Sequence, residues 1–463
     1  MEMDLTNYLK KEDLKKQELK KIFFYRICGT GMGAAAMLLK EKGYEVSGFD
    51  KNFYPPMGDY LKNSGIKLYD KADFNLKDFD LIIVGNVVGK KSDDARMIEK
   101  TGTPFTSFPT ALGALVLDTQ NVVGVAGTHG KTSTTYLLVQ IFKKLGFDPG
   151  YLIGGVLPKG PSSHLGDGSY FFIEADEYDS SYFEKFSKFR SYEIDHLMLT
   201  SLEFDHADIF KGMEEIKDQF RSEIPKLKNP IIANMSYPAL RELREEFGGD
   251  WVELVLPKDL KMHRAGSEFS LRGETYKTNL VGHHNILNLI SALLFALDNG
   301  ISADKLKTAT YNLNLVKRRQ EVRGYYKGSM VIDDFAHHPR AVKMTYEAIS
   351  TKYPKQNIVV VLEPASATAR SNIFQSEFAH ALKEIPQVIL AKPQTATTVE
   401  GSNNLDCYQL AAGHGNASVV EDLTALRSAL DKLAQDNSLF LILSNSTCLG
   451  LWESDFVKHL KSM

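Results

Sequence analysis

Apolar runs alternate with amphipathic stretches along most of the chain. Residues 21–50 predict a strand, a glycine turn, an alanine-rich helix and a second strand, which together form one βαβ unit. A further helix is expected at 282–297, and short buried strands are expected at 79–86, 122–127, 169–176, 196–205, 329–339, 356–364, 386–393 and 438–446. Because continuous apolar runs alternate with helices, the pattern predicts an α/β protein whose parallel sheets are covered on both faces.

The pattern divides the chain into segments. A chain of 463 residues is long enough for about three domains of ~100–200 residues each. We expect an N-terminal arm at 1–20 and domains at 21–112, 113–315 and 316–463. The arm carries Lys and Glu at helical spacing, which predicts a solvated helix or a loosely held segment with no inferred function.

Composition excludes several classes of protein. The apolar fraction is 43%, and 58 acidic side chains nearly balance 55 basic ones, so we expect no nucleic-acid or membrane surface. No run reaches the roughly 18 apolar residues of a spanning helix, and the polar N-terminus does not resemble a signal peptide, so a cytoplasmic protein is expected. Cys28, Cys407 and Cys448 are too few and too scattered for a disulfide framework or a zinc cluster.

A glycine loop with a lysine lies at 127–132, between the strand 122–127 and a predicted helix at 132–145. Backbone N–H groups of such a loop and the following helix N-terminus suit phosphate oxygens. In such a loop Lys131 would bind a β- or γ-phosphate, and the Thr132 hydroxyl would be placed to bind the magnesium ion that bridges those phosphates. The strict P-loop pattern would need glycine where Val125 stands, so the match is to a shorter form. The context predicts a magnesium–nucleotide site.

Acidic residues follow two of the predicted strands. Glu174, Asp176, Glu177 and Asp179 come directly after one apolar run, and Asp205, His206 and Asp208 follow the next one. Carboxylates gathered at a sheet edge are costly unless a cation faces them, so a metal site is predicted, with a solvated acidic loop as the alternative. Spacing alone does not decide whether His206 is a metal ligand, since imidazole is an unusual ligand for magnesium.

A second glycine loop lies about a hundred residues upstream. Gly29, Gly31 and Ala34 fit the dinucleotide pattern G-x-G-x-x-A, and Asp50 follows about twenty residues on at a strand end. NAD binding, and with it an oxidoreductase, is therefore one reading of this loop. The other is a pyrophosphate that rests on the helix N-terminus. Two phosphate loops in consecutive domains indicate two phosphorylated substrates.

Six motifs in this order resemble the Mur ligases of bacterial cell-wall synthesis: AGTHGKT at 126–132, EADE at 174–177, the DH at 205–206, GHHNILN at 282–288, VKRR at 316–319 and DDFAHHP at 333–339. The resemblance implies three α/β domains. These are a Rossmann-like N-terminal domain that binds UDP-N-acetylmuramate, a central P-loop ATPase-like domain that binds ATP, and a C-terminal Rossmann-like α/β domain that binds a peptide. It also implies an ATP-dependent amide ligase that works with Mg²⁺.

The resemblance implies a role for each matching residue. Lys131, Glu174, His206 and Arg319 are the implied catalytic residues, and Thr132, Glu174 and His206 the implied metal ligands. The implied ATP contacts are Gly127, Thr128, His129, Gly130, Lys131, Thr132, Ser133, His284, Asn285, Asn288, Arg319 and Asp334. For the substrates, the implied or assigned contacts are Gly29, Gly31, Met32, Gly33, Asp50, Asn86, His337 and Arg370. Proton acceptance during amide formation is left open among His206, His337 and Asp205.

Within the family, the motifs at 54–57, 174–179, 202–210, 333–339 and 362–364 favour the branch that joins an intact murein tripeptide to UDP-N-acetylmuramate. The alternative is the branch that adds L-alanine, and a ligase like folylpolyglutamate synthase is more distant. A nonenzymatic nucleotide switch is another class to exclude. Ala365 and Arg370 stand where the pattern has a basic residue and a lysine, and 443–454 replaces a more glycine-rich segment. Arg221 falls near the lysine that some members carbamylate. We expect a monomer or a weak homodimer.

Overall fold

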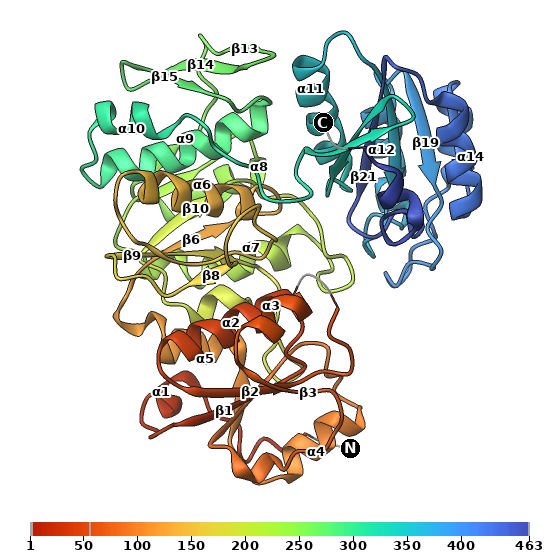
Figure 1. The fold of residues 1–463 in the computed structure, drawn as a ribbon. Helices are drawn as coiled ribbons and strands as arrows, with labels where there is room; N and C mark the ends of the chain where they lie inside the picture. Colours follow the sequence, from red (N-terminus) through yellow and green to blue (C-terminus); the bar gives the residue numbers. More distant parts are fainter. Residues whose placement is uncertain (1–2, 55–56, 462–463) are drawn as a thin grey trace. The chain divides into compact units, whose positions relative to one another are not determined.

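A computed structural model describes residues 3–54 and 57–461, which form two compact units (Figure 1). The first comprises the described residues up to Glu203, together with Met213–Val255 and Ser291–Ala309. The second comprises Phe204–Gly212, Leu256–Ile290 and the described residues from Thr310 onward. Pro55 and Pro56, which belong to the motif at 54–57, lie outside the described residues.

The first unit begins with a five-stranded parallel sheet in the order β3-β2-β1-β4-β5. Its strands are β1 (Lys21–Tyr25), β2 (Glu45–Phe49), β3 (Lys67–Tyr69), β4 (Leu81–Val84) and β5 (Phe105–Ser107), and its helices are α2 (Thr30–Glu41), α3 (Met57–Asn63), α4 (Asp93–Lys100) and α5 (Phe108–Leu115). Helices α2 and α4 lie on opposite faces of this sheet (Figure 1). The βαβ unit predicted from the first apolar runs is confirmed.

A seven-stranded sheet in the order β12-β11-β10-β6-β9-β7-β8 forms the rest of this unit, and only β8 runs antiparallel. Its strands are β6 (Asn121–Ala126), β7 (Gly150–Leu152), β8 (Ser163–His164), β9 (Tyr170–Ala175), β10 (His196–Leu199), β11 (Ile231–Ala233) and β12 (Trp251–Glu253). The helices are α6 (Lys131–Lys144), α7 (Met213–Arg221), α8 (Pro238–Phe247), α10 (Ala303–Ala309) and the end of α9 (His283–Asp298). Ala126 pairs with both Ala175 and Leu199, so the carboxyl ends of three central strands meet at one edge.

The second unit contains a small antiparallel sheet and a larger mixed sheet. The small sheet has β13 (Lys261–His263), β14 (Gly266–Leu271) and β15 (Glu274–Thr278). The larger sheet, in the order β16-β17-β21-β18-β19-β20, has β16 (Glu321–Tyr326), β17 (Ser329–Asp334), β18 (Asn357–Glu363), β19 (Gln387–Ala391), β20 (Ala417–Val420) and β21 (Ser438–Ser444). Its helices are α11 (Pro339–Lys352), α12 (Gln375–Leu382), α13 (Cys407–His414) and α14 (Leu423–Leu433).

Alternate residues of the central strands fill two hydrophobic cores, one on each face of the larger sheet. Ile332, Val360 and Leu441 belong to one core, whereas Val331 and Val361 belong to the other. Burial on both faces explains why these strands are continuous apolar runs. The prediction of an α/β protein with parallel sheets is confirmed, and the strands predicted at 196–205 and 329–339 are shorter, since they end at Leu199 and Asp334.

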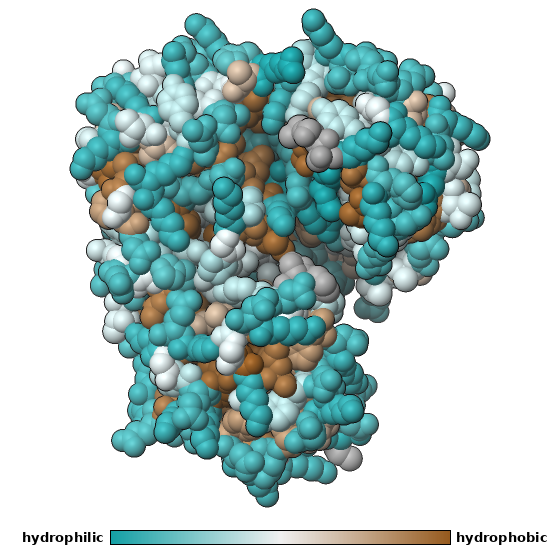
Figure 2. Space-filling model, in the orientation of Figure 1, coloured by the Kyte–Doolittle hydropathy of each residue, from teal (hydrophilic) through white to brown (hydrophobic). Residues whose placement is uncertain are grey.

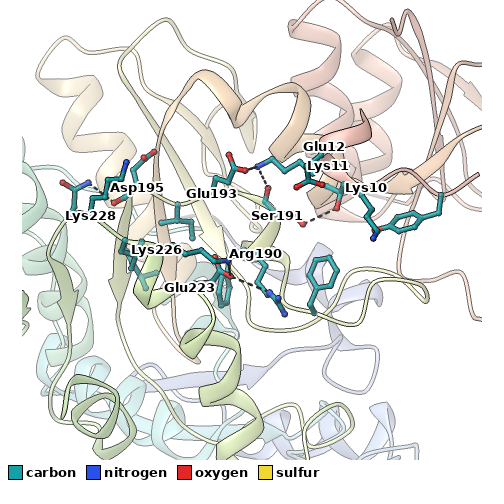
Figure 3. Close-up of a pocket in the computed structure, with 18 residues that line it drawn as sticks. Lys10, Lys11, Glu12, Arg190, Ser191, Glu193, Asp195, Glu223, Lys226 and Lys228 are labelled. Atoms are coloured by element: carbon teal, nitrogen blue, oxygen red, sulfur yellow. Dashed lines mark hydrogen bonds and ion pairs between the residues drawn. The ribbon is translucent and has the colours of Figure 1, made fainter. Parts of the chain in front are cut away.

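The arm is not the solvated helix or loosely held segment that its charge pattern predicts. In the described part of the arm, residues 3–20, only α1 (Lys11–Leu14) is helical, and both of its end residues are buried. The Leu9 N–H donates to the Phe105 carbonyl at 2.9 Å, so the arm extends the edge of β5. The Lys11 ammonium donates to the Ser191 carbonyl at 3.0 Å and lies 2.9 Å from the Glu193 carboxylate (Figure 3). These contacts fasten the arm to the segment that enters β10.

The surface is mostly hydrophilic on the face shown in Figure 2, with apolar residues in patches between charged ones. Among the described residues, no helix has both the length and the hydropathy needed to cross a bilayer.

Candidate active site

The lysine loop lies between β6 and α6, at the edge where three strand ends meet. Gly127 has φ 128°, a conformation that favours glycine, and a Cβ there would lie 2.5 Å from the Ser201 carbonyl oxygen. Lys131 is the first residue of α6, and its ammonium donates to the Gly127 carbonyl at 2.7 Å. The lysine therefore folds back over the loop, and the helix N-terminus faces the same space.

Glu174, the penultimate residue of β9, faces the start of α6. The Thr132 hydroxyl donates to one Glu174 oxygen at 2.8 Å, and the Gly154 N–H donates to the other at 2.5 Å. Burial and the nearby Asp176 charge raise the pKa of Glu174. A hydroxyl and a carboxylate are hard oxygen donors, and a divalent cation beside them would offset the cost of the buried charge. Thr132 and Glu174 thus fit a magnesium ion.

Lys131 lies among acidic groups. Its ammonium is 3.4 Å from the Glu177 carboxylate and 3.7 Å from that of Asp176. Burial alone would lower the pKa of Lys131, but the charges of Glu177, Asp176 and Glu174 outweigh it and raise the pKa above its usual range. Lys131 is therefore a permanent cation at neutral pH. Asp179, by contrast, pairs with the exposed Lys185 at 2.7 Å and lies apart from these contacts.

The segment after β10 holds the lysine loop in place, a role that sequence reasoning missed. The Glu203 N–H donates to the Thr128 hydroxyl at 2.9 Å, and that hydroxyl donates to the Glu203 carbonyl at 3.1 Å. The Ser201 hydroxyl accepts the His129 N–H at 2.7 Å, and the His129 ring lies 3.1 Å from the Glu203 carboxylate. His129 is thus a hydrogen-bonding member of the loop, and its implied contact with ATP stays a prediction.

The upstream glycine loop opens α2, with Gly29 at the N-cap. A Cβ on Gly33 would collide with the Met57 sulfur, so the absence of a side chain here lets Met57 pack closely against α2. The Met32 side chain is buried, so the substrate contact predicted for this residue would be made by its backbone N–H. Asp50 accepts the Cys28 N–H at 2.8 Å and therefore shapes the loop itself. Asn86 is exposed just beyond β4.

In the second unit, Asp334 shapes the turn that carries Arg319. Its two carboxylate oxygens accept the Gln320 and Ala336 N–H groups, each at 2.8 Å. The Arg319 guanidinium lies over the Phe335 ring at 5.0 Å. The Gln320 amide is 3.2 Å from the His284 ring at the start of α9. Nearby in the sequence, Asn285 donates to the Val281 carbonyl at 2.9 Å, and Asn288 is buried on the same helix.

Two of the three candidate proton acceptors, His206 and His337, lie close to the third, the Asp205 carboxylate. Burial alone would raise the pKa of Asp205, but the neighbouring imidazoles of His206, His337 and His338 hold it below its usual range. His206 has φ 54° and its N–H donates to Asp205 at 2.7 Å. His337 lies 2.9 Å from the Phe335 carbonyl through Nδ1. The structure therefore brings these candidates together without choosing among them.

Arg370 lies on the turn that follows β18. Its guanidinium donates to the Thr395 hydroxyl at 2.6 Å and to the Ala365 carbonyl at 3.3 Å, while its Nε has no hydrogen-bond partner among the described residues. Glu363, which sequence reasoning also missed, holds the segment that departs from the glycine-rich family pattern. It accepts the Cys448 N–H at 2.9 Å and the Leu449 N–H at 2.8 Å. Both residues have positive φ, so this carboxylate stabilises a turn that glycines would otherwise favour.

The predicted site residues are divided between the two units. Lys131, Thr132 and Glu174 belong to the first, whereas His206, Asn285, Arg319 and Asp334 belong to the second. Their convergence on one nucleotide stays a prediction.

Three family models match successive parts of the chain. They are the "Mur ligase family, catalytic domain" at 21–119, the "Mur ligase middle domain" at 125–296 and the "Mur ligase, glutamate ligase domain" at 318–446. The chain is 35% identical over 454 residues to the UDP-N-acetylmuramate–L-alanyl-γ-D-glutamyl-meso-2,6-diaminoheptandioate ligase of Escherichia coli, covering 93% of this chain and 96% of that protein. It is 27% identical over 468 residues to the UDP-N-acetylmuramate–L-alanine ligase of Aquifex aeolicus, covering 96% of this chain and 99% of that protein. The crystal structure of a murein peptide ligase from Psychrobacter arcticus aligns with a TM-score of 0.68 at 27% identity, covering 96% of this chain and all of that one.

Proposed function

Because the chain belongs to the Mur ligase family of ATP-dependent amide ligases, we propose that it joins UDP-N-acetylmuramate to the tripeptide L-alanyl-γ-D-glutamyl-meso-diaminopimelate. The observation that carries this choice is the 35% identity, over nearly the full length of both chains, to a relative named for that reaction. The activity would serve peptidoglycan recycling in the cytoplasm, where the intact tripeptide is reused.

In the proposed reaction, the lactyl carboxylate of the sugar attacks the γ-phosphorus of ATP and releases ADP. The resulting acyl phosphate has a good leaving group, and the free amine of the tripeptide displaces phosphate to form the amide. Lys131 and Arg319 would stabilise charge on the transferring phosphoryl group, where most of the catalysis in such transfers resides. The amine must lose a proton as it attacks, and with His206 engaged as a metal ligand, Asp205 and His337 are the groups suited to accept it.

A magnesium ion would be held by Thr132, Glu174 and His206, and when bound it supplies positive charge to the phosphate oxygens of ATP. The pyrophosphate of the sugar nucleotide would rest on the N-terminus of α2, on the N–H groups of Gly31 and Met32, since the Gly33 N–H already donates to the Gly29 carbonyl at 2.8 Å. Arg370 offers a planar donor for a carboxylate of the peptide's third residue.

The competing function is the addition of L-alanine, favoured by the Aquifex aeolicus relative, which the chain matches over almost its whole length. The discriminating experiment measures ADP release from the purified protein with MgATP and UDP-N-acetylmuramate, on adding either the tripeptide or L-alanine. We expect release with the tripeptide alone. Release with L-alanine and none with the tripeptide would replace recycling by de novo synthesis. An Arg370→Met variant should raise the KM for the tripeptide and leave that for ATP unchanged.

A further inference from the structure

Lys188 is a largely covered cation close to the lysine loop, outside the set of proposed catalytic and ligand-binding residues. Its ammonium donates to one oxygen of Asp176 at 2.9 Å, and its side chain is only 11% exposed. It lies 4.1 Å from the centre of the Tyr178 ring and 5.6 Å from the centre of the Phe108 ring. An ammonium held between two aromatic faces and one carboxylate has little freedom to move.

Two partners of Lys188, Asp176 and Phe108, each also contact one of the two glycine loops. Through Asp176, Lys188 shares a carboxylate with Lys131, whose ammonium is 3.7 Å from the other Asp176 oxygen. On the opposite side, Phe108 is the first residue of α5, and a Cβ on Gly31 would lie 3.3 Å from its ring. A continuous set of contacts therefore runs from the glycine loop at the N-terminus of α2 to the lysine at the N-terminus of α6.

We propose that Lys188 is a positioning residue that couples the two phosphate loops, so that occupancy of one loop changes the affinity of the other. This inference rests on the proposed function, in which the loops hold the sugar nucleotide and ATP. Lys188 keeps the Asp176 carboxylate engaged and so leaves the Lys131 ammonium folded back over its own loop, on the Gly127 carbonyl. Without Lys188, the only cation left beside Asp176 in the contacts described here is Lys131, which would be drawn toward it and away from the phosphates.

The coupling is measured as the change in Kd of a non-hydrolysable MgATP analogue, by calorimetry, when UDP-N-acetylmuramate is present. For the wild type we expect a change of about fivefold or more, a typical size for coupling between two sites. Lys188→Met should abolish the change, and Lys188→Arg, which keeps the charge and the stacking, should retain it. Lys185→Met is the matched control: its lysine is on the same segment, is 66% exposed and pairs with Asp179, so the coupling should persist.

A double-mutant cycle keeps the test decisive if Lys188→Met proves unstable. In an Asp176→Asn background, which also removes the unpaired charge, Lys188→Met should change the Kd of the analogue by less than about twofold, since neighbouring residues acting through one group are not additive. If Lys188→Met weakens binding of the analogue equally in the wild-type and Asp176→Asn backgrounds, Lys188 touches the nucleotide directly. That result would overturn the positioning role. Tight binding of both ligands to the wild type without coupling would overturn this inference alone. Failure of UDP-N-acetylmuramate to bind the wild type would instead refute the proposed function.

Discussion

Glu184 joins three distant parts of the first unit, and its replacement makes a quantitative prediction. The carboxylate is 1% exposed and accepts the Tyr8 hydroxyl at 2.9 Å, the Thr110 hydroxyl at 2.9 Å and the Ser107 hydroxyl at 2.5 Å. Glu184→Ala removes three buried hydrogen bonds at about 1 kcal/mol each, so it should cost about 3 kcal/mol. For a domain of about 150–250 residues this lowers the Tm by roughly 6–12 °C.

Differential scanning calorimetry at pH 7.5 measures this change in Tm. Glu12→Ala is the control, because Glu12 is an exposed glutamate on the N-terminal arm that carries Tyr8. The control should shift the Tm by less than about 1 °C, as surface changes usually do. A loss below about 2 °C for Glu184→Ala would refute the reasoning, because three buried hydroxyls would then have found other partners at no cost.

Glu184 also predicts a pH dependence. Burial raises its pKa and outweighs the three hydroxyl donors, which lower it. A carboxyl whose pKa is higher in the folded state favours folding when protonated, so its contribution is lost as the pH rises through that folded pKa. Glutamine at this position does not titrate. The difference in Tm, wild type minus Glu184→Gln, should therefore fall as the pH is raised from acidic values. A difference that stays constant with pH would contradict the raised pKa of Glu184.

Three further predictions concern other buried groups. Burial raises the pKa of Asp333 from 3.8 to about 6, against the opposing charges of two arginines. That shift corresponds to about 3 kcal/mol of stability, lost as the pH rises from about 4 to about 6, and urea titrations should show that Asp333→Asn removes this pH slope. A Cβ on Gly113 would collide with the Ser191 carbonyl oxygen, so Gly113→Ala should destabilise the first unit by about 1–3 kcal/mol in the same titrations, and an unchanged midpoint would contradict the close packing. Thr132→Val removes the hydroxyl that donates to Glu174, so it should lower the rate of ADP release by about ten- to a hundredfold and raise the Mg²⁺ concentration needed for activity. For the wild type, chelation of Mg²⁺ should abolish ADP release, and adding Mg²⁺ back should restore it.

The strands and the lysine loop could be predicted from the sequence because their signals are local. A parallel strand buried on both faces is a continuous apolar run, as at 357–363, and the loop at 127–132 joins such a strand directly to a helix. Glu174 could be proposed because it comes at the carboxyl end of a strand, and parallel strand ends share one edge. These inferences need no knowledge of residues far away in the chain.

The partners of Lys188 and Glu184 could not be predicted in this way. Tyr8 and Glu184 are 176 positions apart, and no spacing rule connects them. Lys188 lies among other charged residues at 184–190, a composition usual for a solvated surface, and its low exposure follows from the packing of α5 against the short 3₁₀ helix Lys188–Ser191. Asp50 and Asp334 show a further limit, because motif position predicts a ligand contact for each and gives no sign that their carboxylates also accept backbone N–H groups of their own turns.

The pairing of the arm with β5 has a consequence for how the protein is handled. β5 is the outermost strand of its sheet, and the backbone bonds that join Asn7 and Leu9 to Phe105 occupy groups that an edge strand otherwise presents to solvent. Exposed edge strands are templates for pairing between molecules. A chain that began at Lys21 would keep every motif of the proposed active site, yet it would uncover this edge and so become prone to aggregation.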